Sequence, residues 1–341
     1  MIVLRIPNGW SVRFHPRALA VGAGAALLAV VLSVFAIGSG DYPMSSADVL
    51  RTLAGRGSPA EDFIIGELRL PRLVTALLVG AALALAGTVF QSLVRNPLGS
   101  PDVLGFTQGA ATGALVVVVV GGSSAALAGA ALAGGLATGL LIYAIAWREG
   151  VHGYRLVLVG IGVAAILTGV NGYLLTRAPL MQAARAVLWL TGSLDGRGWV
   201  NAMPLLIAMA VLVPVLLACG PAVRMIEMGD DTANALGVRV ERLRLVLLGA
   251  AVLLVSLAAA AAGPVSFVAL TAPHVAKRLT RTPGPNLLPS MCVGALLLVA
   301  ADFAAQRAFT AHQLPVGVVT GALGGAYLVW LLATERKAGR I

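Results

Sequence analysis

Long apolar stretches follow one another along most of the chain and are separated by short polar segments. A helix that crosses the hydrocarbon core of a bilayer needs about 20 mostly apolar residues, and a window of about 19 residues locates such helices. The pattern predicts about ten spanning helices. They cover residues 18–38, 72–93, 104–121, 124–146, 155–176, 199–218, 244–262, 264–280, 287–306 and 316–333. We therefore expect an all-α polytopic membrane protein in which residues 1–341 form a single transmembrane domain.

Two of these stretches are less regular than the others. Residues 104–121 run almost directly into the next stretch, and residues 264–280 contain Pro264 and Pro273. Non-helical backbone is tolerated at membrane depth only where it is buried in protein or lines a water-filled cavity. Each of the two stretches is therefore compatible with either a spanning helix or a short re-entrant helix.

The composition agrees with this pattern. Hydrophobic residues make up 59% of the chain and charged residues 11%, whereas an ordinary soluble domain has about 45–50% and 25%. This composition excludes a water-soluble enzyme. The net charge of +10 reflects membrane topology rather than nucleic-acid binding, because 16 of the 24 lysines and arginines fall on one side of the predicted spans. Positive residues mark the cytoplasmic side, so both termini are expected in the cytoplasm.

No segment carries the residue pattern of a catalytic or nucleotide-binding site. The phosphate-binding loop G-x-x-x-x-G-K-[ST] is absent, so ATP with its magnesium ion would have to bind to another chain. Cys219 and Cys292 lie in or beside apolar stretches, and we interpret them as packing residues. The four histidines are scattered, without further metal ligands at suitable spacing. They are His15, His152, His274 and His312. We expect no catalytic residue, cofactor or metal site in this chain.

The longest segment expected on the cytoplasmic side covers residues 224–244. Asp230 or Asp231 can cap a short helix that stops at Gly237, and a second helix is expected to begin near Val238. Two short helices lying across the cytoplasmic face would form a docking surface for another protein. The same pattern is also typical of an ordinary amphipathic connector.

Several charged residues lie near the predicted outer surface. Arg69 and Arg72 are three residues apart at the start of the second span, so on a helix they share a face. They suit either a functional surface or anchoring at the membrane interface. Asp302 is the one acidic residue well inside an apolar stretch, where a charge is costly unless it is paired or hydrated. Arg307 lies too far round an ideal helix to pair with it. We therefore favour a cap or an inter-helix hydrogen bond over a role in the substrate path.

Prolines interrupt the apolar pattern in two places. Pro97 and Pro101 stop the second span and force a turn before the third, and Asn96 can bond the freed backbone groups. The second interruption, near the eighth span, comprises Pro264, Pro273 and His274. We interpret both as structural turns that could also act as gates. A lone histidine there favours a hydrogen-bonded helix end over a metal ligand or a proton relay.

Seven segments together resemble the permease subunits of ABC importers for ferric siderophores, haem and vitamin B12, the iron-chelate uptake permease family. Each segment alone is weak, but all seven occur in the family's order. They cover residues 68–73, 80–87, 91–105, 189–194, 231–237, 262–274 and 314–324. The resemblance implies the type II ABC importer permease fold with ten spans, in the bacterial cytoplasmic (inner) membrane. It also implies a complex of two permeases, two cytoplasmic ABC ATPases that bind ATP-Mg, and an extracytoplasmic substrate-binding protein.

The resemblance implies roles for individual residues. Arg69, Arg72 and Arg307 would meet the binding protein or face the pathway entrance. Asp302 would be a buried polar residue shared with the family. The ATPase-docking residues would be Asp230, Asp231, Ala233, Ala235, Leu236 and Gly237. The gate or helix-break residues would be Asn96, Pro97, Pro101, Pro264, Pro273 and His274.

Residues that differ from the family pattern indicate which subfamily the chain resembles most. Gln306 stands where similar permeases often have arginine, and Gln313 stands where many have glutamate. The end of the chain, residues 313–332, is similar to that of the second permease subunits of ferric enterobactin importers. This similarity implies a heterodimer with a homologous permease and a ferric siderophore as substrate. A haem or cobalamin permease is the alternative, and an ion-coupled secondary transporter is the rival from another class.

Overall fold

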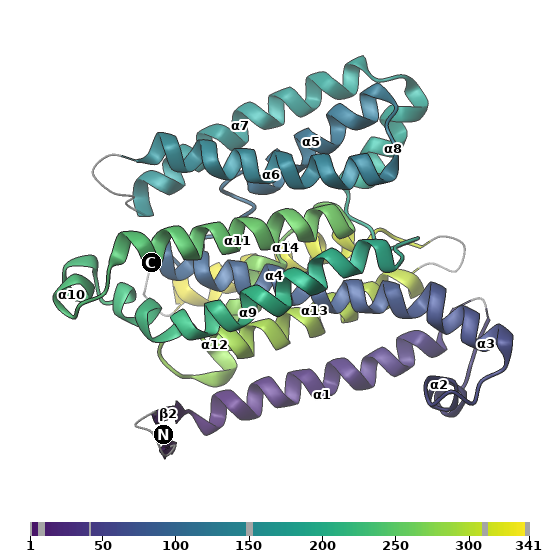
Figure 1. Ribbon diagram of the computed structural model, residues 1–341, viewed down its shortest axis with the longest axis horizontal. Coiled ribbons are helices and arrows are strands. Elements are labelled where there is room, and N and C mark those ends of the chain that lie inside the picture. The colour runs from purple at the N-terminus through teal and green to yellow at the C-terminus, as the bar shows by residue number, and fades with distance from the viewer. Residues whose placement is uncertain (1, 6–10, 41, 148–152, 309–312, 338–341) are drawn as a thin grey trace.

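The structure is a computed structural model, and it describes residues 2–5, 11–40, 42–147, 153–308 and 313–337. Within these ranges the chain folds into a layered bundle of helices (Figure 1). The longer helices are α1 (Pro16–Gly38), α4 (Leu70–Val94), α5 (Phe106–Val120), α6 (Ser124–Ala146), α7 (Gly153–Arg177), α9 (Trp199–Glu227), α11 (Val240–Ala262), α12 (Val268–Thr280), α13 (Leu287–Arg307) and α14 (Val316–Lys337). The shorter ones are α2 (Ser46–Leu53), α3 (Pro59–Phe63), the π-helix η1 (Ile64–Arg69), α8 (Leu180–Leu190) and α10 (Asp230–Ala235).

The predicted helical membrane architecture is confirmed, and each predicted span falls on one of the longer helices. Among the residues that the structure describes, seven helical stretches are long and apolar enough to cross a membrane, and they fall on α1, α4, α6, α7, α9, α11 and α13. The other three predicted spans fall on α5, α12 and α14, whose described apolar helices are shorter. Helix α12 is shorter than the predicted span because residues 263–267, which precede it, are not helical. The total of ten therefore stays a prediction.

The hydropathy pattern missed the short elements, because a window of span length averages them away. Helices α2 and α3 each begin with a capping box, in which Ser45 pairs with Asp48 and Ser58 pairs with Glu61. Serine followed three residues later by an acidic residue is the signal that could have located them. The N-terminal hairpin of β1 (Ile2–Arg5) and β2 (Ser11–Phe14) is antiparallel, and its strands are too short for a clear alternation.

Helices α4 and α11 form the centre of the bundle. In each, 78% of the most apolar window is buried, against 28% or less in α1, α6, α7 and α9. Figure 1 shows α4 surrounded by α9, α11 and α13. The outer helices present large apolar side chains such as Leu140 and Ile166 to the surroundings, where they are 71% and 68% exposed. An exposed apolar surface of this extent suits hydrocarbon rather than water.

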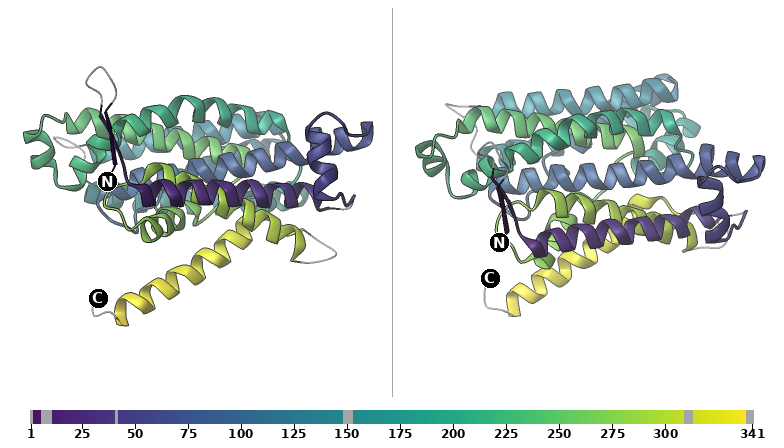
Figure 2. Two further views of the ribbon diagram at one scale, coloured as in Figure 1. Left: turned by 90° about the horizontal axis from the view of Figure 1, so that it is seen from below. Right: turned by 60° about the horizontal axis from the view of Figure 1, so that its bottom comes forward.

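Glycines let α4 approach its neighbours closely. A side chain at Gly80 would collide with the Gly294 carbonyl of α13, and one at Gly87 would collide with the Ala269 carbonyl of α12. In a membrane no hydrophobic force drives helices together, so association depends on such close packing. Two parts lie further from this centre. Helices α5 to α8 form a layer beyond α11 (Figure 1), and α14 leaves the bundle at an angle (Figure 2).

Candidate functional site

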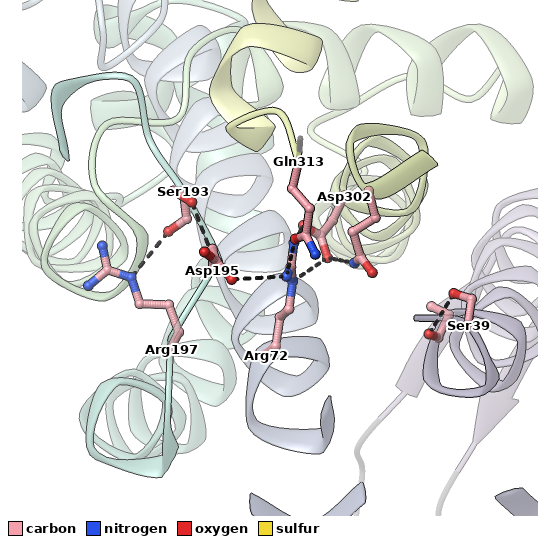
Figure 3. A network of polar contacts seen from close by, with 9 residues as sticks. Ser39, Arg72, Ser193, Asp195, Arg197, Asp302 and Gln313 are labelled. Atoms are coloured by element: carbon pink, nitrogen blue, oxygen red, sulfur yellow. Dashed lines mark hydrogen bonds and ion pairs between the residues drawn. The ribbon is translucent and has the colours of Figure 1, made fainter. Parts of the chain in front are cut away.

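A cavity of about 520 Å³ that contains several charged side chains lies where α4 begins, between the end of α1, the 195–198 segment and α13. We call it the Arg72 cavity. Its charged and amide side chains are Glu67, Arg69, Arg72, Asp195, Arg197, Asp302, Gln306 and Gln313. Figure 3 shows Arg72 at the centre of these groups, with side chains from separate elements pointing toward it. Asp195 and Asp302 lie 123 and 230 residues from Arg72 in the sequence, so the cavity is a product of the tertiary fold.

The Arg72 side chain contacts three other residues of the cavity. Its Nε and Nη2 donate to the two carboxylate oxygens of Asp302 at 3.1 and 2.9 Å. Its Nη1 donates to Oε1 of Gln313 at 2.9 Å and lies 3.5 Å from Oδ1 of Asp195. Gln306 donates to Asp302 at 2.7 Å. The network therefore joins α4, α13, the segment just before α14 and the 191–198 segment.

The network satisfies a charge that would otherwise be buried unpaired. The Asp302 side chain is 9% exposed and the Arg72 side chain 16%. A buried charge is tolerated when it has both a counter-ion and hydrogen bonds. The inter-helix bond expected for Asp302 is thus present, but its partner, 230 residues away, was not predicted. The two glutamines that depart from the family pattern, Gln306 and Gln313, both belong to this network.

The other two arginines singled out in the sequence behave differently. Arg69 borders the same cavity, as its spacing from Arg72 predicts, and donates to the carbonyl oxygens of Ile37 and Tyr42 at 2.6 and 2.7 Å. It therefore holds the end of α1. Arg307 does not pair with Asp302. Its guanidinium lies 4.7 Å from the ring centroid of Phe303, and it is not among the residues that line the cavity.

The 191–198 segment contributes groups that the sequence reasoning missed. Asp195 faces Arg72 (Figure 3), and Arg197 donates to the Ser193 carbonyl at 3.1 Å. Burial lowers the pKa of Arg197, and nearby Asp195 opposes that shift. Gly192 has a φ of +72° and packs against the carbonyl of Pro264. The non-helical residues before α12 therefore pack against the 191–198 segment and help to place Asp195 in the cavity.

The first predicted turn is present at the opposite end of α4. The helix ends at Val94, and Arg95 follows in the left-handed region with a φ of +51°. Asn96 accepts a hydrogen bond from the backbone N–H of Leu98 at 2.9 Å, as expected for a residue that bonds freed backbone groups. Pro101 lies buried in the same turn. A ring nitrogen of His274, Nε2, lies 2.7 Å from the Pro97 carbonyl oxygen and ties α12 to this turn.

The predicted break at Pro273 and His274 is wrong, because both residues lie inside the continuous helix α12. Proline lacks an N–H and frees the carbonyl four residues earlier, which here belongs to Ala269. That carbonyl lies against Gly87 of α4, whose missing side chain gives it room. The break is instead confined to the residues around Pro264. His274 is hydrogen-bonded, but it is not a helix end.

The segment predicted to dock an ATPase lies at the far end of the bundle from the Arg72 cavity, where Figure 1 labels α10. Helix α10 is present, and Gly237, with a φ of +86°, follows it as predicted. Leu236 is 57% exposed and Ala233 is fully buried. The other exposed members of the predicted docking set are Asp231, Ala235 and Gly237.

The predicted capping of α10 is wrong. Its N-cap is Gly229, without a side-chain hydrogen bond. Asp230 bonds instead to Arg244, whose Nη2 lies 2.9 and 2.8 Å from its two carboxylate oxygens. The competing salt bridge draws the carboxylate away from the helix terminus. The following helix also begins slightly later than predicted, at Val240.

Within the described ranges, no group of three or more His, Cys, Asp or Glu side chains could hold a metal ion. Cys219 and Cys292 are free thiols. His152 and His312 lie outside the described residues, as do two of the basic residues counted on the cytoplasmic side, Arg148 and Arg340.

Comparisons with known proteins agree with this architecture. The profile of the FecCD transport family matches residues 26–334. The ferric enterobactin transport system permease protein FepG of Escherichia coli (strain K12) is 46% identical over 90% of this chain and 94% of its own length. The achromobactin transport system permease protein CbrC of Dickeya dadantii (strain 3937) is 37% identical over 92% of this chain and 90% of its own.

A solved structure shows the same fold. It is described as an inward-facing conformation of a metal-chelate type ABC transporter, and it is 27% identical with a TM-score of 0.83 over 94% of this chain and all of that one. The resemblance to iron-chelate permeases, and to the ferric enterobactin subfamily among them, is confirmed. The match over nearly the whole chain, together with several helices long and apolar enough to cross a membrane, identifies a multi-pass membrane transport protein. The chain belongs to the FecCD transport family.

Proposed function

We propose that this chain is a permease subunit of an ATP-driven importer that moves a ferric siderophore across the bacterial inner membrane by alternating access. The observation that carries the proposal is the match over nearly the full length to a ferric enterobactin permease and an achromobactin permease. The ion-coupled secondary transporter has less support, because such a mechanism needs an ionisable group that is free to exchange its ion. Asp302, the one acidic residue deep in an apolar stretch, is held by Arg72 and Gln306.

We infer that the Arg72 cavity is the extracytoplasmic entrance of the pathway. Arg69 and Arg72 border it, and Arg307 is exposed on the neighbouring end of α13. Arg72 is already paired with Asp302, so it is the exposed Arg307 beside the cavity that would meet an acidic group of a binding protein. Under this assignment α10 lies on the cytoplasmic side, which agrees with the bias of basic residues and with cytoplasmic termini.

We infer that α10 receives one of two cytoplasmic ABC ATPases, which would bind ATP-Mg. This inference is supported by the position of α10, which is polar and exposed and projects from the end of the bundle. An exposed apolar side chain lies just beyond each end of the helix. Leu236 is 57% exposed and Met228 is 68% exposed. Methionine is enriched in protein interfaces, and a docked partner would remove the apolar surface of both side chains from water.

We infer that a homologous permease packs against α7 and α14. Several glycines on these two helices, unlike Gly80 and Gly87 of α4, have nothing within 4 Å of where a Cβ would stand in the described part of the chain. They are Gly162, Gly169 and Gly172 on α7 and Gly321 and Gly325 on α14. Small residues at helical spacing allow close approach of another membrane helix. The partner is expected to be a different chain, as the resemblance of residues 313–332 to second permease subunits implies.

Gly321→Leu tests this interface. A Cβ added there meets nothing within 4 Å in the described part of the chain, but a leucine would hold a partner helix away, so we expect recovery of the second permease to fall at least about 30-fold, the effect of an interface hot spot. Co-purification from mildly solubilised membranes measures it. Gly249→Leu is the matched control, because Gly249 of α11 is equally open but lies on another helix. Equal recovery with both variants would contradict the assignment.

The proposed function as a whole is tested by isolating the tagged chain from its own membranes. We expect mass spectrometry to find a P-loop ATPase and a second permease, and ATP hydrolysis to rise when a ferric-siderophore binding protein is added. Stimulation by a haem or cobalamin binding protein alone would change the substrate class. Isolation of this chain without any ATPase would overturn the importer.

A further inference from the structure

We propose that Asp230 is a positioning residue that fixes α10 to the two central helices, so that a movement of α10 reaches the membrane-spanning core. The inference rests on the proposed function, in which a cytoplasmic ATPase docks on α10. Helix α10 has only six residues, and Gly229 provides no side-chain cap. A helix of that length is not stable by itself, so its position depends on contacts with the rest of the protein.

The first of these contacts leads to α11. Nη2 of Arg244 lies 2.9 and 2.8 Å from the two carboxylate oxygens of Asp230. The Arg244 side chain is only 6% exposed, and its second contact, to Glu241, is longer at 3.4 Å. A buried guanidinium is strongly destabilising without its counter-ion. Asp230 and Arg244 are therefore expected to move together, and Arg244 belongs to one of the two most buried helices.

The second contact leads to α4. Nη2 of Arg95, directly after the last residue of α4, lies 3.8 Å from Oδ2 of Asp230. One turn earlier, the Ser92 hydroxyl donates to Glu227 at 2.8 Å. The segment from Glu227 to Asp230 thus touches α4 at two points. Helix α4 then runs without interruption to Arg72 in the cavity at the other end.

The Asp230 side chain lies between α10 and the rest of the protein, not on the outer surface of α10. Its side chain is 22% exposed, whereas Leu236 and Met228 are 57% and 68% exposed. A docked partner would therefore touch these two apolar side chains, and Asp230 would pass their displacement to α4 and α11. This arrangement predicts that loss of the Asp230 charge uncouples the two ends of the protein without releasing the ATPase.

The test compares Asp230→Asn with Asp230→Glu in the complete complex that the wild-type chain recovers. For Asp230→Asn we expect stimulation by the binding protein and uptake to fall about tenfold, as for loss of a site-to-site coupling, and recovery of the ATPase to fall by much less. Asp230→Glu keeps the charge and is expected to restore most of the stimulation. Asp48→Asn is the matched control, since it removes an aspartate that pairs with a neighbouring arginine on another short helix.

The outcomes separate this inference from the proposed function. Normal uptake by Asp230→Asn would overturn it, and so would a loss of ATPase recovery that matches the loss of uptake, because Asp230 would then be a docking contact. Absence of any ATPase with the wild-type chain would overturn the proposed function itself. If the Asp230→Asn protein does not accumulate, Arg95→Gln is the second test of the inference. Arg95 is 44% exposed, and its replacement leaves the ion pair between Asp230 and Arg244 intact. It is expected to reduce uptake about threefold at full ATPase recovery, and unchanged uptake would overturn the role of α4.

Discussion

Asp302→Leu is expected to destabilise the protein by about 3–5 kcal/mol, because it leaves the largely buried guanidinium of Arg72 without its counter-ion. Gln313 would still accept one hydrogen bond, and Asp195, at 3.5 Å and 73% exposed, is a weak substitute. The loss is measured as a lower melting temperature and yield of the detergent-solubilised protein. Arg307→Ala is the control. It removes an exposed arginine that stacks on Phe303 and should cost only about 0.5–1 kcal/mol.

The double variant Arg72→Met with Asp302→Leu separates structure from transport. A buried ion pair replaced by apolar residues of similar volume is often neutral in stability, so we expect most of the lost stability to return. Uptake is then measured at equal amounts of protein. A stable but inactive double variant would support a role of Arg72 at the pathway entrance. A stable and fully active one would limit the pair to a structural role. A single Asp302→Leu variant as stable as the wild type would contradict the importance of the network.

Leu236→Glu is expected to abolish uptake while the protein stays folded in the membrane. Leu236 is already 57% exposed, so a charge there costs little in the isolated chain. In an interface with an ATPase, however, the same carboxylate would be buried without a partner. Loss of an interface hot spot weakens the binding free energy by about 2 kcal/mol or more, so we expect ATPase recovery to fall at least about 30-fold.

Leu50→Glu is the matched control for this variant. Leu50 is 56% exposed on α2, at the other end of the bundle, and the substitution is the same. ATPase recovery with Leu50→Glu should equal that of the wild type. If Leu236→Glu retains its ATPase and its uptake, α10 is not the docking element, and the amphipathic connector becomes the better interpretation of residues 224–244.

The sequence could predict the class of the protein and much of its local structure. A long apolar segment in a bilayer must be helical, because its backbone groups find no water and have to bond within the segment. The spans could therefore be placed without knowledge of any contact. The turn after α4 and the stop at Gly237 followed from equally local rules for proline and glycine. The seven family segments then supplied the fold, because their order is a property of the sequence alone.

Only the tertiary structure decided how the helices are arranged and which charges meet. Hydropathy cannot separate a helix that faces lipid from one that is buried in protein, since both are apolar, and so the central place of α4 and α11 was invisible. Arg72 and Asp302 are 230 residues apart, and no local rule pairs them. Asp230 satisfied the rule for a helix cap, but Arg244, brought close by the fold, offered its carboxylate a buried counter-ion, and that stronger interaction took precedence.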